Sequence, residues 1–133
     1  MNTHLFIIHF PIAAAVLAAA AELIGLASDN AALRVRGGQL LMIAGFAALL
    51  AFLSGEGARL AAVNTGEVDI ARLTLHEQWG SVGAWVLVGA AMGRGVWRNR
   101  FDGAIGWMNA AIVLLAAAMA VGITLTGTGV RHG

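Results

Sequence analysis

The sequence lacks several residue types whose absence limits its chemistry: it has no cysteine, no lysine and no tyrosine, and only one proline in 133 residues. Without cysteine, the chain cannot form disulfides, thiolate zinc sites, cysteine-ligated iron–sulfur clusters or a covalent c-type haem attachment. Any metal ion or cofactor must therefore be held by histidine, carboxylate, methionine or backbone groups.

Charged residues are also scarce. They make up 11% of the chain, whereas hydrophobic residues make up 59%, and the mean hydropathy is +0.82. A soluble domain carries about 25% charged residues, so this chain has too few to cover a water-facing surface. The net charge of +1 is too small to indicate nucleic-acid binding. The composition indicates an integral membrane protein whose main partner is the lipid bilayer.

Four apolar segments are long enough to be candidate membrane spans. A helix needs about 20 apolar residues to cross about 30 Å of hydrocarbon, and only helices satisfy the backbone within a single segment. Short turns make consecutive helices antiparallel neighbours. We therefore predict a single all-α domain over residues 1–133, an integral membrane four-helix up-down bundle with a polar loop over 54–72. The predicted helices cover approximately residues 5–27, 38–53, 73–92 and 104–126.

The distribution of arginines predicts the orientation. Cytoplasmic turns are enriched in positive residues. The two short predicted turns carry Arg34, Arg36, Arg94, Arg98 and Arg100, and the opposite side carries Arg59, Arg72 and Arg131. This pattern places the turns in the cytoplasm and both termini in the periplasm of a bacterial inner membrane. Residues 1–4 contain no arginine or lysine, so we expect the first segment to be a retained helix and not a signal peptide.

Glu22 is an acidic residue near the inner end of the first predicted helix. It could reach the lipid headgroups, or it could pair with Arg34 or Arg36. We favour solvation at the membrane interface for this side chain.

All four histidines fall on the predicted outer side, where Glu56 and Glu77 also lie. In an up-down bundle the first and third helices are diagonal, so His9 and His76 can face each other at matched depth. Two such imidazoles can ligate a b-type haem without cysteine. Gly80 and Gly83 follow His76 on the same helical face and leave room for a porphyrin edge. Ala13 and Val16 occupy the matching positions beyond His9.

A second arrangement of the same outer side chains is a metal site. Histidine and carboxylate ligands suit copper, zinc or iron ions. His4 and His9 are five residues apart, so they point in different directions on a regular helix unless the chain bends near Pro11. His4 and His132 could also contact a haem propionate or face water at the interface. The candidate metal ligands are His4, His9, Glu56, His76 and His132.

The segment His4–Pro11 resembles the N-terminal signature His-Pro-x-x-Val-His-Phe-Pro of a bacterial membrane-protein family known chiefly as a domain of unknown function. Leu5 replaces the first proline and Ile8 replaces the valine. Weaker matches are the Ser54–Ala58 element, the His76–Gly80 element and the glycine-rich end at Gly127–Gly133. Relatives with fused Rieske or cytochrome-type modules imply electron transfer for this family.

Three hypotheses for the function follow. The leading one is a membrane electron-transfer protein, or a redox-complex subunit, that holds a b-type haem between His9 and His76 near the periplasmic face. It would pass electrons from quinol to a periplasmic redox partner. The second is a histidine–carboxylate protein for metal binding or metal transport. The third is a non-catalytic accessory subunit of a larger membrane complex. Since the sequence has no Gly-rich phosphate loop and no hydrolase motif, it does not establish an enzyme.

Overall fold

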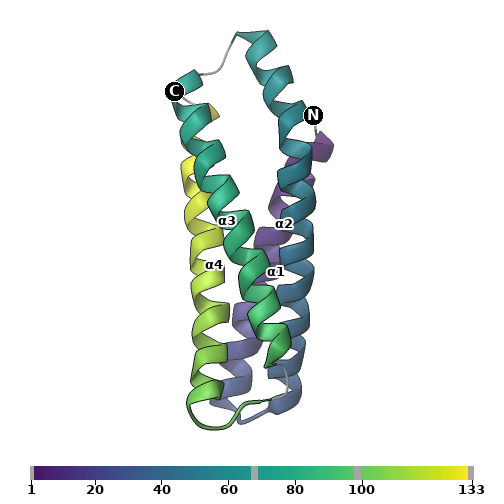
Figure 1. Ribbon diagram of the computed structural model, residues 1–133, viewed down its shortest axis with the longest axis vertical. Coiled ribbons are helices and arrows are strands. Elements are labelled where there is room, and N and C mark those ends of the chain that lie inside the picture. Colours follow the sequence, from purple (N-terminus) through teal and green to yellow (C-terminus); the bar gives the residue numbers. More distant parts are fainter. Residues whose placement is uncertain (1, 67–68, 98–99, 132–133) are drawn as a thin grey trace.

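The computed structural model describes residues 2–66, 69–97 and 100–131, and within them the chain forms four helices. Successive helices run in opposite directions, and the start of α1 and the end of α4 lie at the same end of the bundle (Figure 1). α1 and α3 each contact α2 and α4, so they are diagonal to one another. The all-α prediction is confirmed. The helices are α1 (Asn2–Ala27), α2 (Ala31–Thr65), α3 (Ile70–Val96) and α4 (Gly103–Arg131).

We call the end with the α1–α2 and α3–α4 connections the inner end, and the opposite end the outer end. α2 extends much further toward the outer end than the sequence predicted. The predicted polar loop over 54–72 is wrong, because α2 continues to Thr65 and α3 begins at Ile70. Residues 58–62 are alanine, arginine and leucine, which favour helix whether or not lipid surrounds them. Gly66, with a φ of 67°, ends α2, and the Asp69 side chain accepts a hydrogen bond from the Ala71 N–H at 3.0 Å to begin α3.

Three of the helices in the described part of the chain are long and apolar enough to cross a membrane. The qualifying segments are His9–Ala27, Ala31–Thr65 and Gly103–Leu125. α3 does not meet the same criterion, because its apolar stretch lies between His76–Gln78 at the outer end and Arg94 at the inner end. The predicted span over 73–92 is therefore a helix of intermediate hydropathy.

The core consists mainly of alanine. It includes Ala14, Ala15 and Ala18 of α1, Leu41, Ala44 and Ala48 of α2, Ala84 and Leu87 of α3, and Val113, Ala116 and Ala120 of α4. Small side chains allow helix backbones to approach closely. Among the described residues, none of α2 beyond Ala48 is buried, and none of α3 before Gly83. Toward the outer end, past these two positions, α2 and α3 diverge (Figure 1). In the described part of the chain, α2 and α3 are therefore tightly packed toward the inner end and loosely packed toward the outer end.

Candidate functional site

His76 lies on the face of α3 that points into the bundle. It precedes the fully buried Arg94 by 18 residues, about five helical turns, so the two side chains share one face of the helix. The imidazole is half-buried, and its Nδ1 atom is buried without a hydrogen-bond partner. A buried polar atom of this kind needs a partner, so His76 is a candidate ligand.

His9, unlike His76, lies on an exposed surface of the bundle. It shares one helical face of α1 with Ala13 and Val16, as the sequence predicted, but all three residues are exposed. The face of α1 that packs into the bundle carries Ala14 and Ala18 instead. Within one copy, His9 therefore points away from the bundle interior.

The structure consequently does not bring His9 and His76 together as a pair of facing ligands. A methyl group at Gly80 would meet no atom within 4 Å, so the space beside that glycine is open. At Gly83, by contrast, a methyl group would overlap the Cδ1 atom of Ile123. Gly83 therefore makes room for α4, and Gly80 is the predicted position that leaves space near His76.

No three histidine or acidic side chains come together as a metal site among the residues whose side chains the structure describes. The side chains of His4, Glu56 and His132 lie outside those residues. The five-residue metal site therefore stays a prediction.

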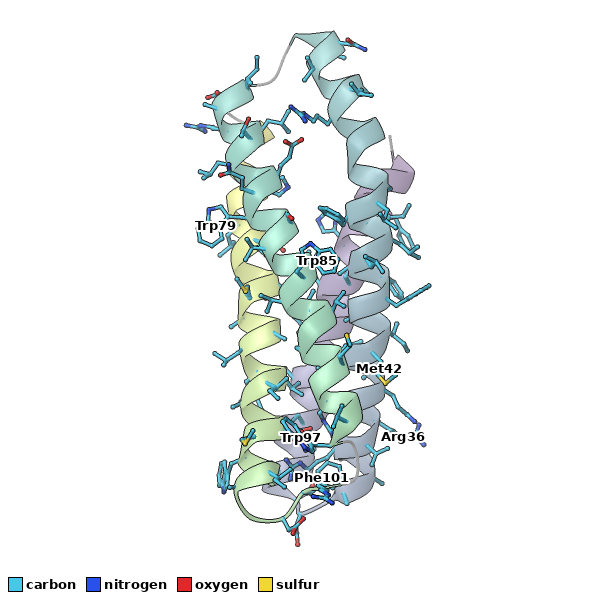
Figure 2. All side chains as sticks on the ribbon, viewed as in Figure 1. Arg36, Met42, Trp79, Trp85, Trp97 and Phe101 are labelled. Carbon is cyan, nitrogen blue, oxygen red and sulfur yellow. The ribbon has the colours of Figure 1, made fainter. Side chains whose placement is uncertain are left out.

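Charged and aromatic side chains link α2 and α3 near His76. Arg59 Nε is 3.4 Å from Glu77 Oε1, and the exposed fractions of the two side chains are 51% and 34%. Further toward the inner end, the rings of Phe52 and Trp85 meet edge to face with centroids 6.2 Å apart. Figure 2 shows Trp85 on the side of α3 that faces α2. The ion pair thus involves the neighbour of His76 in sequence, and the aromatic pair links the same two helices nearer the inner end.

The most completely buried charged residues lie at the inner end, where sequence reasoning did not place a site. Glu22 has no exposed surface, and Arg34 Nε donates to its Oε1 atom at 2.7 Å. Arg94 Nη2 is 3.8 Å from Glu22 Oε2. The expectation that Glu22 is solvated at the interface is wrong, because the two arginines enclose its carboxylate. The alternative, a pairing of Glu22 with Arg34, is what the structure shows.

The α3–α4 connection and the start of α4 complete this cluster. Arg34 Nη2 also donates to the Gly106 carbonyl at 2.7 Å, and Arg94 Nη2 donates to the Arg34 carbonyl at 2.8 Å. The ring centroid of Phe101 lies 4.6 Å from the Arg34 Cζ atom and 5.0 Å from that of Arg94, which is cation–π geometry. Figure 2 shows Phe101 at the inner end of the bundle. We call Glu22, Arg34, Arg94 and Phe101 the inner cluster; it joins α1, α2 and α3 to the α3–α4 connection.

Charged residues within apolar helices were the sequence signal that could have revealed the inner cluster, and glycines beside it make room for their side chains. A methyl group at Gly38 would lie 3.2 Å from Arg94 Cζ, and one at Gly25 would lie 2.6 Å from Arg34 Cγ. Charged residues within apolar helices usually face the bundle interior and pair with one another. Gly25 and Gly38 leave room for Arg34 and Arg94, which come from the next helix in each case, so the charges themselves were the stronger signal.

Comparison of the chain with protein-family models, with curated proteins and with solved structures finds no match. The resemblance at His4–Pro11 therefore stays an expectation from the motif.

Proposed function

We propose that the chain is a membrane protein of four spans that holds a histidine-ligated cofactor at its outer end, with a b-type haem as the first candidate. The observation that carries this proposal is the buried, unpartnered Nδ1 atom of His76. The same atom sits on the loosely packed part of the bundle, beside the open space at Gly80.

The membrane assignment has physical support from the described helices. Three of them have the length and composition of membrane spans, and many large apolar side chains, including Phe46, Trp85 and Trp107, are exposed. In water these side chains would form large apolar patches, whereas in lipid they face hydrocarbon. α3 packs between α2 and α4, so it crosses with them as the fourth span. The arginine distribution favours the cytoplasm for the inner end and the periplasm for the outer end.

A haem at this end would be ligated by His76 alone, because His9 faces away from the bundle interior. Haem iron is held by a single proximal histidine in several protein classes, so the outward direction of His9 does not remove the site. His76 would hold the iron, and Glu77 would add negative charge beside it. A bound haem supplies one-electron chemistry. The chain would then carry electrons from quinol in the bilayer toward a periplasmic partner, as the sequence hypothesis proposes.

A visible spectrum of the purified protein tests the proposal. We expect a Soret band and a reduced α band in the wild type, and loss of both bands in His76→Ala, because this substitution removes the iron ligand. His9→Ala is the matched control, and its spectrum should be that of the wild type. If His9→Ala also loses the bands, the facing pair of the sequence prediction is correct and α1 must rotate to form it.

The remaining hypotheses give different results in the same preparation. Copper, zinc or iron in elemental analysis without a haem spectrum would favour the metal site of His4, His9, Glu56, His76 and His132. If the purified protein bound neither haem nor metal, the cofactor proposal would be contradicted and only the accessory-subunit hypothesis would remain.

A further inference from the structure

Arg59 faces the same part of the bundle as His76. It follows the fully buried Leu41 by 18 residues, about five turns of α2, so it continues the face of α2 that packs into the core. His76 has the same relation to Arg94 on α3. Both side chains lie past the last buried residues of their helices, where α2 and α3 diverge (Figure 1). A guanidinium and an imidazole therefore point from two helices toward one loosely packed region.

The contact of Arg59 with Glu77 leaves the guanidinium available to a ligand. The distance of 3.4 Å is long, and both side chains are partly exposed, so solvent screens the pair and it contributes little stability. Arg34 is different: it is buried, and its donors reach Glu22 and the Gly106 carbonyl at 2.7 Å each. Arg34 is committed to the fold, whereas Arg59 can exchange its partner.

We propose that Arg59 binds a carboxylate of the ligand that His76 holds, so that the outer site selects an anionic, carboxylate-bearing molecule. This inference rests on the proposed function. A planar guanidinium matches a carboxylate through two parallel hydrogen bonds, which lysine or glutamine cannot reproduce. Glu77 then acts as the internal competitor that occupies Arg59 until the ligand's carboxylate replaces it.

Titration with two porphyrins tests this proposal. Haem-free protein in detergent is titrated with ferric protoporphyrin IX, which has two carboxylates, and with its dimethyl ester, which has none; the Soret band reports binding. The wild type should bind the diacid more tightly than the ester, by on the order of tenfold to a hundredfold for a charged hydrogen-bonded pair. Arg59→Gln should bring the diacid down to the affinity of the ester and leave the affinity of the ester unchanged.

Two further variants make the test sharper. Glu77→Gln should increase the preference for the diacid, because it removes the competing carboxylate from Arg59. Arg36→Gln is the matched control: Arg36 is exposed near the inner end of α2 (Figure 2), whereas His76 lies in the outer part of α3, and loss of Arg36 should change neither affinity. Helix content by circular dichroism checks that each variant is folded.

The outcomes distinguish a failure of this inference from a failure of the proposed function. If the wild type binds neither porphyrin, the haem proposal and this inference both fail. If both porphyrins bind with equal affinity, or if folded Arg59→Gln keeps the preference for the diacid, the haem proposal stands and the role of Arg59 is wrong.

Discussion

At the residue scale, Glu22 is the only carboxylate within the inner cluster. It faces two buried guanidiniums, those of Arg34 and Arg94, so the cluster carries one positive charge in excess. Arginines in an apolar interior are stable only where carboxylates, carbonyls or aromatic faces surround them. Phe101 and two backbone carbonyls supply the rest of that environment.

Replacement of Glu22 should therefore destabilise the protein strongly. Glu22→Gln keeps the shape and removes the charge, which leaves two like charges side by side in a buried position. Removing one partner of a buried ion pair costs about 3–5 kcal/mol. Unfolding of the variant by increasing dodecyl sulfate in mild detergent, followed by circular dichroism, measures the change. Asp29→Asn, in the exposed turn at the same end, should shift unfolding by less than about 0.5 kcal/mol. Equal stability of Glu22→Gln and wild type would show that the cluster is not what holds the inner end.

At the scale of elements, hydropathy predicted that four helices exist but not where α2 ends. The outer part of α2 carries Arg59, Asn64 and Thr65, and a stretch with such residues looks like a loop when only apolar length is considered. The true turn is marked by local chemistry instead: Gly66 permits the left-handed conformation and Asp69 caps the next helix. Helix-capping residues were therefore a better guide to this boundary than hydrophobicity.

The directions of the site residues were only partly predictable. His76 shares its face with Gly83 and Arg94, so the polar pattern of α3 indicates which side faces inward. The apolar part of α1 gives no such contrast, because alanine occurs on every side of it; Ala13 is exposed and Ala14 is buried. The one polar residue within that part is the buried Glu22, which lies about 140° around the helix from His9. The inward direction predicted for His9 was wrong because Glu22 was expected to be solvated at the interface and was not used to orient the helix.

Glycines on these helices differ in the space around them, so the same substitution to alanine should change stability differently at two of them. Gly25→Ala should destabilise the protein by about 1–3 kcal/mol, because the new methyl group would overpack against Arg34. Gly89 has no atom within 4 Å of the position its methyl group would take. Gly89→Ala should be neutral or stabilising by up to about 1 kcal/mol, since alanine favours helix. The same dodecyl sulfate titration compares both variants. A Gly25→Ala protein as stable as Gly89→Ala would contradict the close packing around Arg34.

At the scale of the whole molecule, the two ends of the bundle differ in how their helices are packed and linked. The inner end is closed by Glu22, Arg34, Arg94 and Phe101, and the core alanines lie next to it. At the outer end, α2 and α3 diverge and are linked by the exposed Arg59–Glu77 pair (Figure 1). A ligand would therefore enter from the outer end, and the orientation of the bundle decides from which compartment it comes.

Single cysteines can establish that orientation, because the chain has no native cysteine and each introduced thiol is unique. We expect Asn30→Cys and Arg100→Cys, in the two inner connections, to react with a membrane-impermeant maleimide only after cells are opened. Asn64→Cys, near the outer end of α2, should react in intact cells whose outer membrane admits the reagent. This pattern follows from the positive-inside rule and from four crossings.

α3 is the helix whose crossing most needs this test, because it is the least apolar helix and does not qualify as a span on its own. If α3 did not cross, Asn64 and Arg100 would lie on the same side of the membrane and react alike. If Asn30→Cys reacted in intact cells and Asn64→Cys did not, the bundle would have the opposite orientation, with the His76 site on the cytoplasmic side.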